Sequence, residues 1–147
     1  MANLFGSNIF ERDEGLHKTQ VTIGLCPANV IRGDSSDGIV ITGGYAISHA
    51  DSSNAFIPLD LPDGVNIDNA IIYGSHYLET KFGLGRTAVT GIGVSNLITP
   101  GLINVERAVE QLSFVDNINY NYYIYFEDFN DLNYIFGGKL TYTEGGI

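Results

Sequence analysis

The amino-acid sequence predicts an all-β fold: a single antiparallel β-sandwich of jelly-roll-like form, preceded by an extended N-terminal arm. Residues 120–126 and 134–143 are rich in Tyr, Phe, Ile and Thr, which suit a pleated, half-buried surface. The polar residues 127–133 between them can turn the chain. In addition, 18 glycines are spread along the chain without a fixed period, as short strands joined by tight turns require.

One domain accounts for the chain, because 147 residues can bury a hydrophobic core without metal or disulfide support. We expect residues 1–18 to form the arm and residues 19–147 the sandwich. Charged residues at 11–14 interrupt any regular period in the arm. Its apolar residues are spaced as anchors for a partner: Leu4, Phe5, Ile9 and Phe10. Such an arm folds back on its own domain or docks on a neighbouring subunit, and the sequence leaves both alternatives open.

Short strands are expected at the start of the sandwich domain. Residues 19–25 alternate between apolar and small or polar side chains, which indicates a strand. Residues 39–42 and 45–48 are two further strands. The composition of residues 32–38, rich in Gly, Asp and Ser, predicts a loop.

The middle of the chain continues this pattern. Residues 56–61 lead into a Pro-Asp-Gly turn at residues 62–64, in which proline fixes φ and glycine accepts a positive φ. Residues 65–74 are expected to be a strand, with apolar side chains at positions 65, 67 and 71. Two more strands are predicted at residues 77–82 and 87–94, the second of which contains two glycines.

Residues 99–114 fit two structures. Thr99 and Pro100 are typical of a helix N-cap followed by proline at the first helical position, and apolar residues then repeat at helical spacing. Val105 and Val109 also share one face of an extended strand. We predict the extended strand, because the neighbouring segments are all β.

The strand at residues 120–126 has two different faces. Alternation places Tyr120, Tyr122, Ile124 and Phe126 on one face, and Tyr123 and Tyr125 on the other. One of the faces must be core. If the other is open, Tyr123 and Tyr125 can stack against sugars; the alternative is that they fill the core or a subunit interface, where Tyr is enriched.

Several segments also occur in a recognisable order. They are an L-P-D-G turn at 61–64, Y-G at 73–74, V-D-N at 115–117, Y-N-Y-Y-I at 120–124 and I-F-G-G-K-L-T-Y-T at 135–143. This order resembles a loosely defined group of β-sandwich domains in bacterial surface and phage virion proteins, over residues 57–143. The sequence departs from that pattern at F-G-G, which replaces Y-G, and at Leu140, which replaces Ile. The resemblance implies a β-sandwich and a virion or cell-surface setting, and it carries over no catalytic residue.

The charge pattern narrows the class of partner. The net charge is −10, and only seven Lys and Arg residues are scattered along the chain. Binding to a phosphate backbone needs clustered positive charge, so no nucleic acid and no anionic membrane is expected as a partner. The first residues lack the basic and long apolar regions of a secretory signal, which predicts synthesis in a host cytoplasm.

We expect no catalytic residue. The histidines (His17, His49 and His76) share no metal-pair spacing, and Cys26 is interpreted as a small core residue. Two G-x-G segments, at 83–85 and 91–93, lack the strand, helix and Lys-Ser/Thr pair of a nucleotide loop. We interpret their glycines as turn residues.

Acidic loops are the remaining candidates for a cofactor, and the cofactor would be Ca²⁺. Carboxylate oxygens suit this ion, and loops of β-sandwiches supply them. The candidate ligands are Asp34, Asp37, Asp128 and Asp131. Their spacing is not that of an EF-hand, and solvated loop charge is the alternative.

The leading functional hypothesis is a non-enzymatic structural virion protein. It would be a capsid decoration (cement) protein or a small surface spike, assembled as a homotrimer and bound to a capsid or other virion protein through the arm. The alternative is a carbohydrate-binding or adhesin module that uses Tyr123 and Tyr125, with or without Ca²⁺. An enzyme is the third possibility, but no sequence motif indicates one.

Overall fold

The computed structural model describes residues 18–33, 38–75, 79–91, 93–111 and 114–145. Their elements are β1 (Lys18–Leu25), the 3₁₀ helix η2 (Pro27–Asn29), β2 (Ile31–Arg32), β3 (Ile39–Ile41), β4 (Ala46–Ser48), β5 (Ala55–Leu59), β6 (Asn66–Gly74), β7 (Lys81–Ala88), β8 (Val94–Leu102), β9 (Arg107–Ala108), β10 (Tyr120–Glu127) and β11 (Tyr134–Gly145). Within these ranges, no helix is long and apolar enough to cross a membrane.

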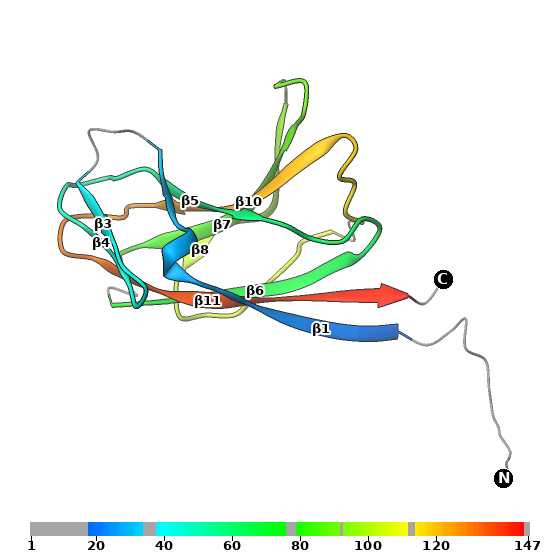
Figure 1. Cartoon of the computed structure of the whole chain (residues 1–147), viewed down its shortest axis with the longest axis horizontal. Coiled ribbons are helices and arrows are strands. Elements are labelled where there is room, and N and C mark those ends of the chain that lie inside the picture. The colour runs from blue at the N-terminus through cyan, green and yellow to red at the C-terminus, as the bar shows by residue number, and fades with distance from the viewer. Residues whose placement is uncertain (1–17, 34–37, 76–78, 92, 112–113, 146–147) are drawn as a thin grey trace, which may run out of the picture.

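The strands form two antiparallel sheets that lie face to face (Figure 1). Sheet A has the order β3-β4-β11-β6-β9, and β1 also pairs with β11. Sheet B has the order β2-β5-β10-β7-β8. Every pairing is antiparallel, so the all-β, two-layered prediction is confirmed.

The two aromatic strands that dominate the sequence pattern lie in different sheets. Strand β10 lies in the middle of sheet B between β5 and β7, whereas β11 lies in the middle of sheet A. The loop at residues 128–133 therefore carries the chain from one layer to the other. Strand β11 pairs with β6 on one side, and with β4 and then β1 on the other.

The hydrophobic core lies between the sheets. Sheet B contributes Phe82, Leu84, Ile98 and Ile124, and sheet A contributes Ile67, Ile72, Ile135 and Leu140, all of them fully buried. On β10 the side chains of Tyr122, Ile124 and Phe126 are buried, while Tyr123 and Tyr125 lie on the opposite, outer face. The prediction of two different faces on this strand is thus confirmed.

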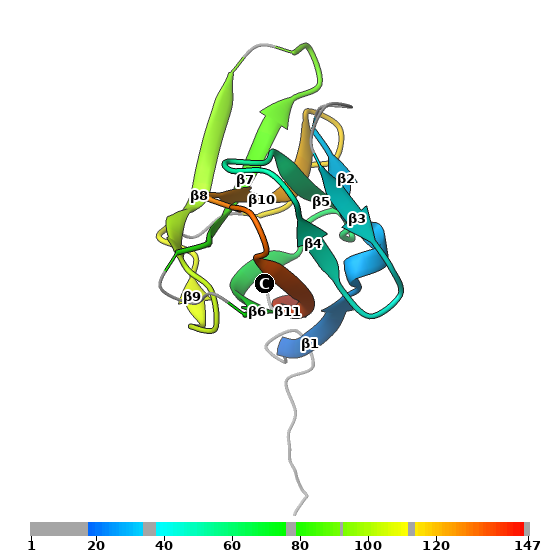
Figure 2. The same cartoon turned by 90° about the vertical axis from the view of Figure 1, so that its left-hand side faces the viewer.

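The strand predicted at residues 87–94 is wrong. These residues are the end of β7, a turn and the first residue of β8. Gly91 and Gly93 adopt φ of 82° and 89°, and the Gly91 N–H donates to the Ala88 carbonyl at 2.8 Å. Because these positive φ values favour glycine, the chain reverses here, and the β7–β8 hairpin extends beyond the rest of the sandwich (Figures 1 and 2).

Residues 99–114 are extended only in part. The extended alternative holds for Thr99–Leu102, which belong to β8, and for the two residues of β9. Between them Asn104 adopts a φ of 64°, and its side-chain amide donates to the Gly74 carbonyl at 2.9 Å. This turn prevents one continuous strand, and it directs β9 to the edge of β6, so the segment crosses from sheet B to sheet A.

The apolar residues on the inner face of β6 are not all the ones that the sequence predicts. Ile67, Ala70 and Ile72 are buried, whereas Ile71 is half-buried on the outer face. The register with β11 shifts between Thr141 and Tyr142, so one β6 residue is bulged out of the pairing. A one-residue shift exchanges the two faces of a strand, which accounts for the position of Ile71.

Candidate binding site on the outer face of sheet B

Tyr123 and Tyr125, the tyrosine pair, lie side by side on the outer face of sheet B. Their ring centroids are 6.0 Å apart, and the ring planes are inclined by 56°. Phe56 of β5 meets Tyr123 edge-on, with a centroid distance of 6.4 Å. The result is a row of three aromatic side chains across β5 and β10, on a face that no other element of the described chain covers.

Two glycines of β7 form the floor beneath the tyrosine pair. Gly83 pairs with Tyr125 in the antiparallel register, and Gly85 pairs with Tyr123. A Cβ atom on Gly83 would lie 2.6 Å from Cζ of Tyr125, and one on Gly85 would lie 3.3 Å from Cζ of Tyr123. Each ring therefore leans across β7 and covers a glycine, which leaves its other side partly exposed.

These two glycines were misassigned from the sequence as turn residues. Gly83 and Gly85 are strand residues, whereas Gly91 and Gly93, which have the same spacing, do form a turn. A signal for the difference exists in the sequence. Gly-x-Gly at 83–85 matches Tyr-x-Tyr at 123–125, the spacing that places two rings over two glycines on one sheet face.

Hydrogen bonds fix the orientation of both rings. Thr87 Oγ1 donates to the Tyr123 hydroxyl oxygen at 3.0 Å, and the Tyr125 hydroxyl donates to Asn96 Oδ1 at 2.8 Å. Burial raises the pKa of Tyr125, with a smaller contribution from the negative charge of Glu127. The phenol therefore stays protonated at neutral pH and keeps its role as a donor.

Charged groups lie at one end of the aromatic row. Lys81 Nζ and Asp128 Oδ2 form an ion pair at 2.6 Å, and the hydrogen bond with Asp128 raises the pKa of Lys81. Glu127 lies directly across from Lys81 in the β10–β7 register. Asn121, at the opposite end of β10, is exposed. The face thus offers partly exposed aromatic rings bordered by hydrogen-bonding side chains.

The calcium candidates do not assemble into a site within the described part of the chain. Asp128 is engaged by Lys81, and Asp131 is exposed in the same loop. Asp34 and Asp37 lie outside the described residues. No group of three or more His, Cys, Asp or Glu side chains that could hold a metal ion occurs among the residues that the structure describes.

Two further predictions concern single residues. Cys26 is exposed, so its assignment to the core is wrong. Its neighbours Leu25 and Pro27 are both buried, so Cys26, between them, faces outward. The four proposed anchors of the arm, Leu4, Phe5, Ile9 and Phe10, all lie outside the described residues, so their role stays a prediction.

Comparison with known proteins gives no further assignment. The chain matches no protein-family model, and the searches of curated proteins and of solved structures found no significant match.

Proposed function

We propose that this chain is a structural protein of a virion surface, either a capsid decoration (cement) protein or a small spike, with a jelly-roll-like sandwich and a trimeric assembly. The observation that carries the proposal is the position of β1. It begins at Lys18, which pairs with Gly145 at one end of sheet A (Figure 1). A segment that ends at Lys18 can therefore hold the sandwich by one end and leave the remainder displayed.

The mechanism is apolar anchoring repeated over many copies. Each arm would bury its four apolar side chains against a capsid protein, at about 25 cal/mol per Å² of apolar surface removed from water. Repetition over a shell then raises the total strength of attachment beyond that of one contact. Two apolar side chains at the β7–β8 hairpin, Val89 and Val94, are more than half exposed and provide surface for contacts between subunits.

A deletion of residues 1–15 tests the arm. We expect the shortened chain to keep the thermal unfolding transition of the sandwich and to lose co-sedimentation with purified particles of the source virus. Leu132→Ser is a matched control, because Leu132 is 56% exposed and lies outside the arm. Undiminished occupancy of particles by the shortened chain would show that the arm is not the anchor.

Carbohydrate binding by the tyrosine pair is the second candidate function. The observation that favours it is the glycine floor, which supports one side of each ring while hydrogen bonds hold both hydroxyls. Partly exposed aromatic rings can stack on the C–H face of a sugar, and the polar neighbours can bond its hydroxyls. The chain's negative charge favours a neutral sugar over a sulfated or sialylated one.

A glycan array, read with and without Ca²⁺, tests this second function. We expect retention of a neutral glycan by the native chain and its loss in the double variant Tyr123→Ala, Tyr125→Ala. Tyr45→Ala is the matched control, since Tyr45 is an exposed tyrosine of the β3–β4 turn. If the native chain retains no glycan, or if the control loses retention equally, the tyrosine pair is not a sugar site.

A further inference from the structure

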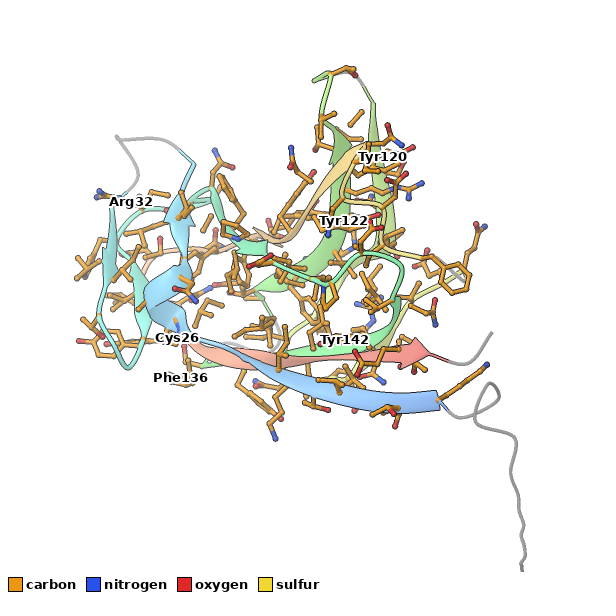
Figure 3. The ribbon with its side chains drawn as sticks, turned by 45° about the vertical axis from the view of Figure 1, so that its right-hand side comes forward. Cys26, Arg32, Tyr120, Tyr122, Phe136 and Tyr142 are labelled. Atoms are coloured by element: carbon orange, nitrogen blue, oxygen red, sulfur yellow. The ribbon has the colours of Figure 1, made fainter. Side chains whose placement is uncertain are left out.

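An open hollow of ≈ 620 Å³ lies on the outer face of sheet A, where β1 ends. Figure 3 labels two of its residues, Cys26 and Phe136, close to each other at this end of the sheet. We call it the sheet A hollow. It is lined by Gly24, Leu25, Cys26, Tyr73, Phe136, Gly137, Gly138 and Lys139.

Gly24 opens the hollow and aromatic rings form its walls. A Cβ atom built on Gly24 would meet nothing within 4 Å, so the space beside Lys139 of the neighbouring strand β11 is left empty. Tyr73 and Phe136 are 39% and 50% exposed, which is high for aromatic side chains beside one another on a sheet. Phe136 also stacks on Tyr134 at a centroid distance of 6.0 Å, which extends the aromatic wall. The lining is therefore mainly apolar and is uncovered in the described chain.

The chain itself contains a segment of the right length and composition to cover it. Residues 1–17 directly precede Lys18, the first residue of β1. The other end of β1, Gly24 and Leu25, lines the sheet A hollow. The thirteen steps from Phe5 to Lys18 can span about 43 Å, while the seven steps from Lys18 to Leu25 cover about 23 Å. Leu4 and Phe5 can thus reach the hollow with enough chain to reverse direction near Gly15.

The distribution of charge also favours residues 1–17 as the segment that covers the hollow. Between its apolar residues and β1, the segment carries Glu11, Asp13 and Glu14 against one Arg. The face of sheet A that it would cross carries Lys18 at the start of β1 and Lys139 at the hollow. These are two of only seven Lys and Arg residues in the whole chain. An acidic segment that returns along β1 therefore runs between positive charges.

We propose that the sheet A hollow is the docking site of Leu4 and Phe5 of the chain's own N-terminal segment. Their apolar side chains would lie between Tyr73 and Phe136, above Gly24, and would shield the exposed thiol of Cys26. The inference concerns the isolated chain and does not depend on a virion role. In that role, docking keeps the anchors out of water until a particle surface competes for them.

The reaction rate of Cys26 with a polyethylene-glycol maleimide tests the proposal, because Cys26 is the chain's single cysteine and lines the hollow. In the variant Leu4→Ser, Phe5→Ser we expect the rate to rise about tenfold over that of the native chain, as release of a docked segment would give. Ile118→Ser is the matched control, since Ile118 is 79% exposed on another part of the surface, and its rate should equal the native one. Equal rates in all three chains would overturn the proposal.

A second measurement tells the chain's own segment from that of another copy. The sequence contains no Trp, so Phe5→Trp introduces a single quencher for a bimane label on Cys26. We expect the label to be quenched in this variant at every protein concentration, and to remain bright when Trp replaces Val94 of the β7–β8 hairpin instead. Quenching that disappears on dilution would assign the hollow to the segment of a second copy and overturn docking within one chain.

Discussion

Gly24 and Gly138 line the same hollow on neighbouring strands, yet the space around each of them is different. A Cβ atom built on Gly24 meets nothing within 4 Å. One built on Gly138 would overlap the carbonyl oxygen of Ile71 and lie 2.8 Å from Cδ1 of Ile72. Only Gly138 is thus required by the close approach of β11 to β6. The packing of the sheet does not require glycine at position 24.

Alanine substitutions separate the two cases. Gly138→Ala should lower the free energy of unfolding by about 1–3 kcal/mol, the usual cost of overpacking. Gly24→Ala should leave it unchanged or raise it by about 0.5–1 kcal/mol, because Ala loses less backbone freedom on folding. Urea unfolding at equilibrium gives both values. A larger loss for Gly24→Ala than for Gly138→Ala would contradict the packing described at this face.

For single residues, the sequence predicts which side chains of β10 face the core, because the alternation of a strand alone decides the direction of each side chain. It does not predict that Cys26 is exposed. The apolar run that ends at Leu25 favours burial for the next small residue, but Leu25 and Pro27 are both buried and Cys26 faces outward between them. The direction of one side chain here depends on the short η2 helix, for which proline at its first position is the only local signal.

Residues 107–110, which include β9, protect β8, an edge strand of sheet B. The Glu110 side chain accepts hydrogen bonds from Thr99 of β8, from its hydroxyl at 2.6 Å and from its N–H at 3.2 Å. Arg107 donates to the Thr99 carbonyl at 3.2 Å. An edge strand that is bonded in this way offers less backbone to other chains. The bonds from Thr99 lower the pKa of Glu110.

This arrangement predicts a stability difference that depends on pH. The pKa of Glu110 is lower in the folded chain than its ordinary value of 4.5, so its contribution to stability is present above that value and is lost as the pH falls through the folded pKa. Glu110→Ala should therefore melt at a lower temperature than the native chain at pH 7, and this gap should narrow on acidification. Glu106→Ala is the control for the loss of one negative charge, because Glu106 is an exposed glutamate in the same segment. A gap that stays constant with pH would count against the Thr99 bonds.

Element boundaries are the part of the fold that the sequence predicts least well. The strand regions at both ends of the chain are found because β-branched and aromatic residues alternate there. The β7–β8 region is misplaced, because Gly83-x-Gly85 and Gly91-x-Gly93 are identical in spacing and opposite in structure. Their difference lies in the partner across the sheet. The tyrosine pair covers the first two glycines, and such a pairing between distant segments is invisible to a local pattern.

For the molecule as a whole, the charge of −10 is the dominant electrostatic feature. Acidic groups are crowded together more closely in the folded chain than in the unfolded one, which costs stability through self-repulsion. The exposed ion pair between Lys81 and Asp128 offsets little of this, because water already screens such a pair.

Salt should therefore stabilise the protein. Raising NaCl from about 0.01 M to about 0.15 M shortens the Debye length from about 30 Å to about 8 Å. We expect the melting temperature to rise by about 2–4 °C for each kcal/mol of repulsion that is screened. Scanning calorimetry measures this, and the double variant Asp60→Lys, Glu106→Lys should show a smaller rise. A melting temperature that falls with salt would mean that attractive pairs outweigh the repulsion.

The position of β11 also determines when the protein can fold during synthesis. Sheet A is organised around its last strand, which pairs with β1, β4 and β6. A nascent chain has all the strands of sheet B once β10 has left the ribosome, but it cannot close sheet A until β11 emerges. Until then β1 waits without its partner, with most of the chain between them, and such distant pairings slow folding. A chain terminated before Tyr134 would leave β1 without a partner and would expose one edge of β4, one edge of β6 and the inner face of sheet B. It would therefore become a substrate for chaperones and proteases.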